Sequence, residues 1–460
     1  MRVADPARVE KPAPIVVVGG GMVGPVVAIY LARRFGDVTL LERTSTPAGP
    51  VSAGRSLQIV LSARGWHALR DLGLEEDARA VSLPLHGRLE HGAAGELTEQ
   101  PYGRRGEKIW CVERSRLNRL LMNAAAAEPG VTMYRGIRVL SVDPDGPTVL
   151  VEGAQGERRL RFKRLIGCDG AFSRVRAAFP HRPDSVQINT LELGYKEIRI
   201  PADSDGGWRL PNEFFHIWPR DRALFSAFPN PSGDFTGSLF LPLEGEGISF
   251  DTVKMGDDAV VLFKRLFPDL VDLIPDLADQ YQSHPTNSIV TVRCDRWVWR
   301  DKLALVGDSA HAMAPFMGQG MNCGFEDARI LDECLARVGN SEPDWAAAFA
   351  EYERGRKPNV EAIADISIRH YRNLASSTAH VGGALRNRVA QRLYGRFYDE
   401  HIPLYERCAF TEEPYAQAWR HHCATECLID DLLSRHGGHA LLSASPDEFA
   451  GLVDVSEKSI

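Results

Sequence analysis

Residues 15–24 have the sequence IVVVGGGMVG, and they are followed by a helix-like segment over 25–34 and a strand-like run at 38–42. A Val-rich run of this kind is typical of a buried parallel strand. Strand, helix and strand follow one another within about 30 residues, the length of one βαβ unit. This stretch therefore predicts a parallel α/β sheet and decides the fold class of the chain.

The glycines of the same stretch predict a dinucleotide site. Gly19, Gly21 and Gly24 have the spacing G-x-G-x-x-G, which permits a tight turn and lets the backbone approach a pyrophosphate at the N-terminus of the next helix. Glu42 ends the second strand, where a carboxylate can accept hydrogen bonds from ribose hydroxyls. A glycine-rich turn that binds nothing is the alternative, and the complete strand–helix–strand context favours the dinucleotide site.

Size and composition limit the classes of protein to which the chain can belong. At 460 residues it is too long for one ordinary hydrophobic core, so we expect two packed domains and a tail. A net charge of −7 without a long basic run argues against nucleic acid as a partner. Eight cysteines without framework spacing fit a reducing compartment, and no apolar run reaches the length of a membrane helix. We therefore expect a cytoplasmic protein without a membrane partner.

The order of expected elements divides the chain into four parts. We expect a disordered lead-in over 1–13, a discontinuous nucleotide-binding domain over 14–185 and 286–345, a substrate domain over 186–285, and a helical C-terminal region over 346–460. The substrate domain is predicted from alternating, aromatic-rich segments typical of an antiparallel sheet. Part of 80–112 is expected to face the substrate, and the C-terminal helices are expected to break at prolines such as Pro358.

Two further motifs repeat the pattern of a buried strand that runs into a glycine turn with an acid. They are GCDGAFSRVR at 167–176 and GDSAHA at 307–312, which continues into GQGMN at 318–322. Such an acid suits hydrogen bonding to polyol hydroxyls, and small residues that open a helix expose N–H groups to phosphates. Asp308 is our candidate for holding a ribityl chain, although Asp is also a good helix N-cap. The backbone of 318–322 is our candidate for the wall against a flavin ring.

Together these motifs resemble those of the single-component flavoprotein aromatic hydroxylases, and within that group the sequence is most similar to the kynurenine 3-monooxygenase family. The resemblance extends from about residue 14 to about residue 420, and its most specific part is GQGMNCGFED at 318–327. Other matching segments are GRS at 54–56, LS at 61–62, RSRLNRLL at 114–121, GYKE at 194–197, HIWPR at 216–220, PNP at 229–231, DFT at 234–236 and LFLP at 239–242.

The resemblance implies an α/β fold: a Rossmann-like FAD-binding domain with an inserted antiparallel-sheet substrate domain and a helical C-terminal region. It implies FAD as the cofactor, NADPH and O2 as co-substrates, an aromatic amino acid as the small-molecule substrate, and a monomer or homodimer. Reduced flavin would form a C4a-hydroperoxide that hydroxylates L-kynurenine, or a ring-modified kynurenine, at the 3-position. Because the cofactor carries this chemistry, no side chain is assigned a certain catalytic role and no metal site is expected.

The expected cofactor contacts lie in the glycine turn, at strand ends and in the loop before the long helix. They are Gly19, Gly21, Met22, Val23, Gly24, Glu42, Arg43, Arg55, Arg114, Val139, Asp169, Asp308, Gly320, Met321 and Asn322.

The resemblance places Arg88, Tyr102 and Tyr405 in a clamp for the α-carboxylate of the substrate. Arg offers a bidentate fork, and the two phenols add hydrogen-bond donors. Taken singly, each residue is better explained as a solvated strand residue, a loop aromatic or a helix-packing residue; together they favour the clamp. The other expected substrate contacts are His370, Phe215, Leu224, Ser226, Phe228, Phe240, Pro315 and Gln319.

Several of these positions depart from the family pattern. His370 stands where the family has Asn, Ser226 where it has Ile, and Phe228 where it has Leu. Such differences are worth only about 1–3 kcal/mol, so kynurenine could still be accepted. They leave open a hydroxylase of another carboxylate-bearing aromatic, such as an anthranilate or a tryptophan-derived acid.

Two other readings of the chain remain open at this point. A flavin-dependent reductase acting on an apolar substrate would need no carboxylate clamp, and a flavin-binding protein without turnover would consume no NADPH. His311 follows the third motif directly and is either a proton relay or a packing histidine.

Overall fold

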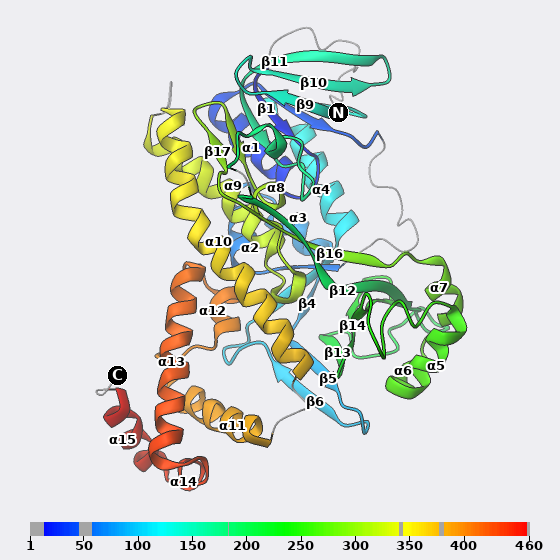
Figure 1. Ribbon diagram of the computed structural model, residues 1–460, viewed down its shortest axis with the longest axis vertical. Helices are drawn as coiled ribbons and strands as arrows, with labels where there is room; N and C mark the ends of the chain where they lie inside the picture. The colour runs from blue at the N-terminus through cyan, green and yellow to red at the C-terminus, as the bar shows by residue number, and fades with distance from the viewer. Residues whose placement is uncertain (1–12, 46–57, 183, 340–343, 377–380, 458–460) are drawn as a thin grey trace.

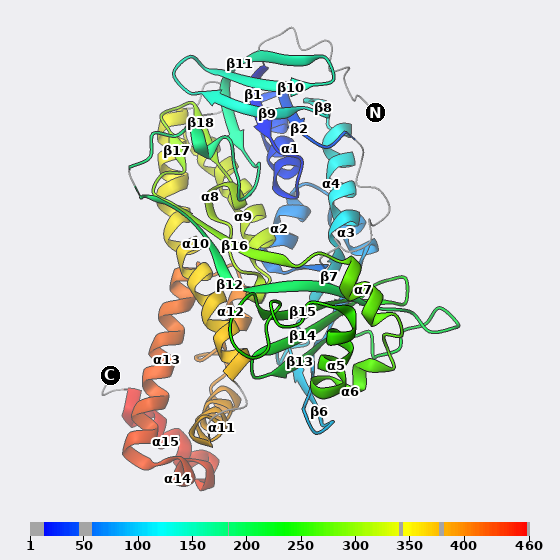
Figure 2. The same ribbon diagram turned by 45° about the vertical axis from the view of Figure 1, so that its right-hand side comes forward.

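The computed structural model describes residues 13–45, 58–182, 184–339, 344–376 and 381–457. Figures 1 and 2 show these residues as an elongated molecule with the C-terminal helices at one end. The lead-in expected over 1–13, apart from Ala13, and the expected cofactor contact Arg55 lie outside the described residues.

An eight-stranded sheet forms the centre of the first domain. Its main strands are, in spatial order, β17 (Val298–Trp299), β18 (Leu303–Leu305), β11 (Gly156–Gly167), β1 (Ala13–Val18), β2 (Val38–Glu42) and β8 (Val131–Arg135), and β10 (Thr148–Gly153) and β9 (Arg138–Asp143) continue from β11. The pairs that join β18, β11, β1, β2 and β8 are all parallel. The buried parallel strand predicted at 15–18 is thus at the middle of the sheet, where both faces are covered.

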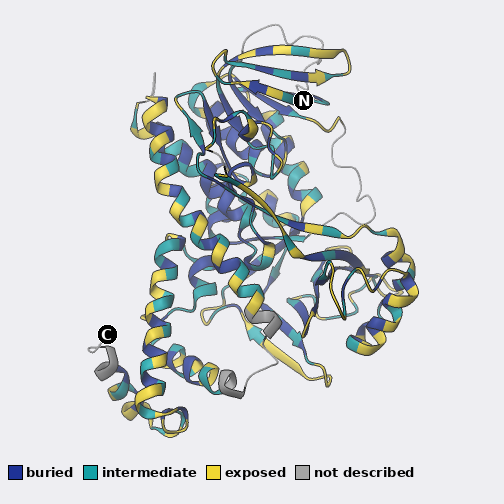
Figure 3. Ribbon diagram, viewed as in Figure 1, coloured by how far each residue is buried: buried dark blue, intermediate teal, exposed yellow. Residues whose placement is uncertain are grey.

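Helices cover this sheet and close its core. They are α1 (Val23–Phe35), α4 (Arg114–Ala127), α9 (Gly320–Arg337) and the first part of α10 (Trp345–Ser376). Their apolar side chains join those of the strands in the largest buried cluster of the molecule, which Figure 3 shows as a dark centre. The Gly-rich turns between strands and helices therefore meet at one edge of a rigid layer.

The second domain is built on a seven-stranded sheet. Its strands are, in order, β16 (Asn287–Cys294), β12 (Val186–Ile200), β15 (Phe235–Pro242), β14 (Ala223–Pro229), β13 (Phe214–Arg220), β5 (Gly87–His91) and β6 (Leu97–Pro101). All neighbours pair antiparallel except β13 and β5. The sheet therefore takes β5 and β6 from the N-terminal part of the chain, and β16 from the stretch after 286 that the sequence assigns to the first domain.

One face of this sheet is covered by three short helices, α5 (Gly256–Leu266), α6 (Pro268–Val271) and α7 (Leu277–Ser283). Residues such as Trp218, Phe225 and Phe263 fill the core between the sheet and the helices. The opposite face is turned toward the first domain and α10 (Figure 2). This second face carries the residues expected to bind substrate.

A small sheet and two helices connect the two domains. The sheet has the order β3 (Gln58–Leu61), β7 (Ile109–Glu113) and β4 (Ser82–Leu85), and α2 (Ala63–Asp71) and α3 (Glu75–Ala80) lie between β3 and β4 in the chain. The helix α2 packs mainly against α9.

The C-terminal region is helical, as expected. Its elements are α10, α11 (Val381–Arg396), α12 (Leu404–Phe410), α13 (Tyr415–His436), α14 (Gly438–Ser443) and α15 (Pro446–Glu457). The last helices share a separate apolar core with members such as Leu393, Ile429 and Phe449. The break expected at Pro358 is wrong, because α10 is continuous through it. Tyr352, Val360 and Ile363 are buried on both sides of the proline, and this packing offsets the lost hydrogen bond.

Taken together, these layers confirm the predicted fold class, a Rossmann-like α/β domain with an inserted sheet domain and C-terminal helices. No helix in the described part of the chain combines the length and the apolar character that crossing a membrane requires.

Candidate active site

The glycine turn after β1 uses its three glycines in three different ways. Gly19 has φ +108°, and a Cβ there would lie 2.3 Å from the Cys168 carbonyl oxygen, so only glycine fits. A Cβ on Gly24 would lie 1.8 Å from the Gly19 carbonyl oxygen, so α1 packs directly on the turn. A Cβ on Gly21 would meet no atom within 4 Å. Gly21 therefore faces open space, which is where a pyrophosphate approaches the backbone in a dinucleotide site.

The N-terminus of α1 directs backbone N–H groups at this space. Met22 precedes the helix without capping it, and the first turn, which starts at Val23, holds no acidic residue. Orphan N–H groups and the helix dipole favour an anion at such an end. Asn118 of α4 donates from Nδ2 to the carbonyl oxygens of Gly20 and Gly21, at 2.9 and 2.8 Å. Sequence reasoning missed this support, whose only signal was its place within the matching segment 114–121.

Glu42 lies beside the turn, as the βαβ pattern predicts. Its Oε2 accepts a hydrogen bond from the Gly20 N–H at 2.6 Å, and its Oε1 accepts one from the Thr44 N–H at 2.7 Å. The carboxylate is thus held next to the open space in front of Gly21. Arg43 follows it and is exposed, and Val139 is buried on β9, next to the end of β2.

The second and third motifs meet in space. Ser309 donates from Oγ to Asp169 at 3.1 Å, and the Gly170 N–H donates to Ser309 Oγ at 2.9 Å. Asp169 also accepts hydrogen bonds from Ser173 Oγ and from the N–H of Arg174, at 2.5 and 2.7 Å. The Asp169 carboxylate therefore holds its own turn together and links it to the third motif.

Asp308, in contrast, is free. It begins the short helix α8 (Asp308–His311), after Gly307 with φ +64°, and it is exposed. Its carboxylate makes no hydrogen bond or ion pair to any residue that the structure describes. An exposed acid without a partner at this turn fits the expected contact with a polyol chain.

Hydrogen bonds of the Asn322 side chain hold the loop before α9 in place. Asn322 donates from Nδ2 to the carbonyl oxygens of Val60 and Gly318, each at 2.9 Å, and its Oδ1 accepts a hydrogen bond from the Ser62 N–H at 3.0 Å. Gly318 has φ +63°, and no side chain caps the N-terminus of α9 at Gly320 and Met321. Backbone N–H groups are thus presented on one side of this loop. We call the glycine turn 19–24, Glu42, Asp308 and the loop 318–322 the cofactor cradle.

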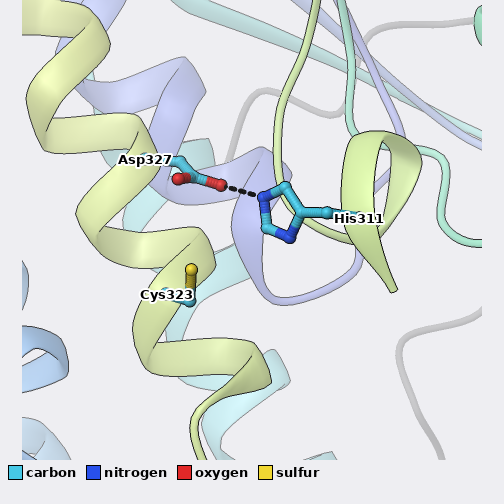
Figure 4. Close-up of side chains that lie close together, drawn as sticks. All are labelled: His311, Cys323 and Asp327. Atoms are coloured by element: carbon cyan, nitrogen blue, oxygen red, sulfur yellow. Dashed lines mark hydrogen bonds and ion pairs between the residues drawn. The ribbon is translucent and has the colours of Figure 1, made fainter. Parts of the chain in front are cut away.

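His311, Cys323 and Asp327 lie close together beneath the cradle, with ligand atoms within 4.8 Å of one another (Figure 4). Arg356 fills the position that a cation would need, because its Nε donates to Asp327 at 2.7 Å and its NH2 to Cys323 Sγ at 3.2 Å. His311 Nε2 lies 2.5 Å from Asp327 Oδ2. The cluster is therefore part of a buried polar network that Arg356 joins.

Asp327 is the shared partner of this network. It also accepts a hydrogen bond from the Gly307 N–H at 3.2 Å, which ties it to the turn that carries Asp308. Burial tends to raise the pKa of the Asp327 carboxyl, but the charges of His311 and Arg356 outweigh it and lower the pKa to about 2. The carboxylate is thus ionised throughout the physiological range and fixes one wall of the cradle.

The expected clamp residues come together from four separate parts of the chain. Arg88 lies on β5, with its guanidinium carbon 5.9 Å from the ring centroid of Tyr405 at the start of α12. The Tyr405 ring stacks on Tyr102 at 5.5 Å and on His370 of α10 at 6.2 Å. We call these four residues the carboxylate clamp.

The electrostatics of the clamp leave Arg88 as its charged group. Burial raises the pKa of Tyr405 to about 12, although Arg88 opposes that rise, so the phenol stays protonated. Burial raises the pKa of Tyr102 as well. Burial and the nearby Arg88 lower the pKa of His370 to about 4, so the imidazole is neutral at pH 7.

Four of the other expected substrate contacts form two apolar groups on the free face of the substrate sheet, and we call these groups together the aromatic wall. Phe215 and Phe228 stack at 4.1 Å and pack with the clamp tyrosines and Val60. Leu224 and Phe240 pack with Phe316, whose ring lies 5.8 Å from that of Phe240. Phe316 was missed from the sequence, although its neighbour Pro315 was expected.

Ser226 lies on β14 between these two groups, since Leu224, Ser226 and Phe228 alternate on one face of the strand. Gln319 is another expected substrate contact, and its side chain has partners within the chain. It is buried, its Oε1 accepts a hydrogen bond from Tyr415 Oη at 2.8 Å, and its Nε2 lies 3.3 Å from Ser62 Oγ.

Arg64 anchors the C-terminal segment next to Tyr405. Its guanidinium donates to the carbonyl oxygens of Cys408 and Thr411, at 2.6 and 2.8 Å, and stacks on the Tyr415 ring at 3.8 Å. It also pairs with Glu326 at 3.1 Å. Sequence reasoning missed Arg64, because nothing in the local pattern of α2 indicates a partner more than 300 residues away.

Comparisons with known proteins agree with this geometry. A family model described as an FAD binding domain matches residues 12–218 and 274–367. The kynurenine 3-monooxygenase of Christiangramia forsetii is 36% identical over 412 residues, which are 89% of this chain and 91% of that protein. The kynurenine 3-monooxygenase of Salinispora tropica is 39% identical over 412 residues, 88% of this chain and 89% of that protein. The chain belongs to the kynurenine 3-monooxygenase family.

The fold of this kynurenine 3-monooxygenase family member is shared with more distant flavoproteins. A tetrameric form of 2-methyl-3-hydroxypyridine-5-carboxylic acid oxygenase superimposes with a TM-score of 0.65 at 22% identity, covering 81% of this chain and 94% of that one. The resemblance stated from the sequence motifs is thus confirmed, and the chain is a flavoprotein aromatic monooxygenase by family.

The cradle also passes a structural test for FAD. It has open space in front of Gly21, an uncapped helix end at Val23 and a free carboxylate at Asp308. These are the features that a pyrophosphate and a polyol chain need. Arg114 begins α4 and lies close enough to Tyr195 of β12 to oppose the rise in its pKa that burial causes. Arg114 therefore stands where the two domains meet.

Proposed function

We propose that the chain is an FAD- and NADPH-dependent monooxygenase that hydroxylates L-kynurenine, or a ring-modified kynurenine, at the 3-position. The observation that carries the proposal is the carboxylate clamp, in which Arg88, Tyr102, His370 and Tyr405 meet next to the aromatic wall. A reductase of apolar substrates has no use for such a clamp. The clamp therefore favours an aromatic substrate that carries an amino-acid carboxylate.

Each clamp residue has a role that follows from its charge state. Arg88 binds the α-carboxylate with its planar fork, which is the strongest contact available there. Tyr102 and Tyr405 donate hydrogen bonds to the same group, because burial keeps both phenols protonated. The neutral His370 adds a donor without a second positive charge. The amino-acid end of the substrate is thus held at the edge of β5.

The aromatic wall positions the ring to be hydroxylated. Val60 packs in one cluster with Tyr102, Phe215 and Phe228, and its carbonyl oxygen accepts the hydrogen bond from Asn322 in the cradle. The wall and the cradle therefore share Val60 as a common support. Bound FAD, once reduced by NADPH, supplies the activated oxygen from O2; the chain itself orients the ring and excludes water.

A purified, FAD-loaded preparation tests this proposal. We expect L-kynurenine to stimulate NADPH oxidation, O2 to be consumed in equal amount, and the product to gain the mass of one oxygen atom. NADPH oxidation that releases peroxide with every ligand would reject kynurenine as substrate. A panel that includes anthranilate and tryptophan-derived acids distinguishes the alternative hydroxylases. Reduction of a substrate without oxygen incorporation would indicate a reductase instead.

A further inference from the structure

The free face of the substrate sheet is organised in rows across the strands. In the pairing register of β12, β15 and β14, Tyr195, Phe240 and Leu224 are opposite one another and form an apolar row. Cross-strand neighbours point to the same face of a sheet. The next row in this register consists of Glu197, Ser238 and Ser226. A row with two serines and a carboxylate therefore lies beside an aromatic row on the face turned to the substrate.

Both serines of this row are buried and have no partner. Ser226 is 7% exposed and Ser238 is 8% exposed. Neither hydroxyl makes a hydrogen bond to any residue in the part of the chain that the structure describes. A ligand that covers these hydroxyls without offering a hydrogen bond would leave them unpaired, which is costly, so a ligand that supplies a partner is favoured.

The opposite face of the same strands is mostly apolar. There Ile198, Leu239 and Phe225 pack on α5–α7. The buried Lys196 on that face is fully engaged, because its Nζ donates to the carbonyl oxygens of Tyr281 and His284. On the free face, the serine pair separates the Phe215–Phe228 group from the Leu224–Phe240 group, and these belong to two distinct apolar clusters. The hydroxyls thus lie between the two apolar groups of this wall.

The chemistry of the two hydroxyls decides which ring substituent suits this row. A serine hydroxyl carries one O–H donor and two acceptor lone pairs, so it can form a hydrogen bond with an amino or a hydroxyl group. A methyl group or a hydrogen atom on the ring offers it no partner. The row is therefore suited to an amino or hydroxyl substituent.

We propose that Ser226 and Ser238 form a polar row that selects the substrate's aromatic ring by an amino or hydroxyl substituent on it. The inference rests on the proposed function, because it concerns the ring whose amino-acid end the clamp holds. It assigns ring specificity to residues outside the clamp. A ring without such a substituent would leave the two hydroxyls unpaired and bind less well.

Binding to the FAD-loaded protein without NADPH tests the row apart from turnover. We would measure dissociation constants from the change in flavin absorbance for 2-amino-4-oxo-4-phenylbutanoate, for its three aminophenyl isomers, of which L-kynurenine is one, and for matched hydroxyl and methyl derivatives. We expect the native protein to bind at least one amino or hydroxyl ring about 10-fold more tightly than the unsubstituted ring and its methyl isostere.

Two variants of the row and one control complete the design. Ser226→Ala and Ser238→Ala should each reduce this preference to about 2-fold or less, while the unsubstituted ring binds as tightly as before. Ser82→Ala removes another buried hydroxyl, which is bonded to the Ala78 carbonyl oxygen away from the wall, and should keep the preference.

The outcomes separate the row from the proposed function. A native protein that binds all rings equally, or a Ser226→Ala variant that keeps the full preference, would overturn the row while leaving kynurenine hydroxylation intact. A native protein that binds none of these amino acids and oxidises no NADPH with them would remove the proposed function itself, and the row with it.

Discussion

Arg88 is the residue on which substrate affinity should depend most. Arg88→Ala removes the only charged group of the clamp and should raise KM for L-kynurenine about 10- to 100-fold, because a charge-assisted bidentate contact is worth about 1.5–3 kcal/mol. FAD content should not change, since Arg88 is outside the cradle. Steady-state kinetics and the flavin absorbance of the same preparation check both.

Arg105→Ala is the matched control, because Arg105 is in the nearby loop and pairs with Asp399 on the surface. It should alter KM by less than about 3-fold, the usual range of an exposed ion pair. Equal effects of Arg88→Ala and Arg105→Ala would contradict the clamp.

Titration of His370 should not contribute to the pH dependence of substrate binding. Its pKa is lowered to about 4 by burial and by Arg88, so it is neutral on both sides of pH 6.5, where a free histidine titrates. We expect KM profiles of the native protein and of His370→Asn to run parallel between pH 5.5 and 8. A step near pH 6.5 that disappears in His370→Asn would contradict this.

The same lowered pKa predicts a stability effect in acid. The unfolded chain takes up a proton on His370 below about pH 6.5, whereas the folded chain resists until about pH 4. The stability that neutral His370 permits is therefore present above pH 6.5 and is lost as pH falls toward 4. The Tm of the native protein should fall over this range more than the Tm of His370→Asn.

Asp327→Asn should be strongly destabilising. It removes the buried anion that pairs with Arg356 and is bonded to His311, a change that typically costs about 3–5 kcal/mol. The pKa of Asp327 is lowered to about 2, so its contribution is complete above about pH 4 and is lost as pH falls toward 2. Urea unfolding at pH 7 and at pH 3 measures both effects. Asp332→Asn on the same helix, which removes a pair with Arg34 nearer the surface, should cost about 1 kcal/mol or less.

At the scale of single residues, the sequence predicted which residues lie together in the clamp better than it predicted the hydrogen-bond partners of each side chain. Arg88, Tyr102, His370 and Tyr405 could be expected together only through the family resemblance, because no local pattern links positions more than 300 residues apart. Gln319 was expected at the substrate, and the structure adds a hydrogen bond from Tyr415 to its side chain. The local sequence could not reveal this bond, since the partner comes from α13.

Among the elements, the βαβ unit with its glycine turn was the most predictable part, because its signals are local. The structure adds a distinction that the spacing alone does not contain. Gly24 is required by packing, whereas Gly21 faces open space. Substitutions at Gly21 and Gly24 should therefore have different effects, the first on FAD binding and the second on stability.

Gly21→Val should fold normally and lose FAD, because its side chain would enter only the space that the cofactor needs. Gly24→Ala should destabilise the apo-protein, because its Cβ would collide with the Gly19 carbonyl oxygen at 1.8 Å. The Tm of apo-protein and the flavin retained on purification distinguish the two. A normal Tm for Gly24→Ala, or full flavin content in Gly21→Val, would refute the assignment.

The sheets were less predictable than this unit. The strand at 287–294 has the composition of either domain, and only its pairing with β12 places it in the substrate sheet. The parallel pairing of β5 with β13 joins residues about 125 positions apart, as in the His91–His216 contact, and leaves no periodic signal in either segment. Helix α10 continued through Pro358 because buried contacts on both sides outweigh a local breaker.

At the scale of the molecule, Arg64 joins the first domain to the C-terminal segment. Arg64→Ala removes its contacts with the Cys408 and Thr411 carbonyl oxygens and with Glu326, which should lower stability by about 3–5 kcal/mol. Because these contacts follow Tyr405 directly, KM for L-kynurenine should rise as well. Thermal unfolding and kinetics measure the two effects.

Arg70→Ala on the same helix is the control, because Arg70 is exposed and pairs with Glu75. It should change Tm and KM little. A loss of stability in Arg64→Ala without any change in KM would show that Tyr405 keeps its place independently of this anchor.

The cofactor cradle ends at residue 322, whereas the carboxylate clamp is complete only when Tyr405 has docked. The ribosome therefore delivers every part of the flavin site about 80 residues before the last part of the amino-acid site. A ligand that binds only the folded state stabilises it. FAD should therefore stabilise the fold through the earlier part of the chain, whereas an amino-acid ligand stabilises it only once the later helices are in place.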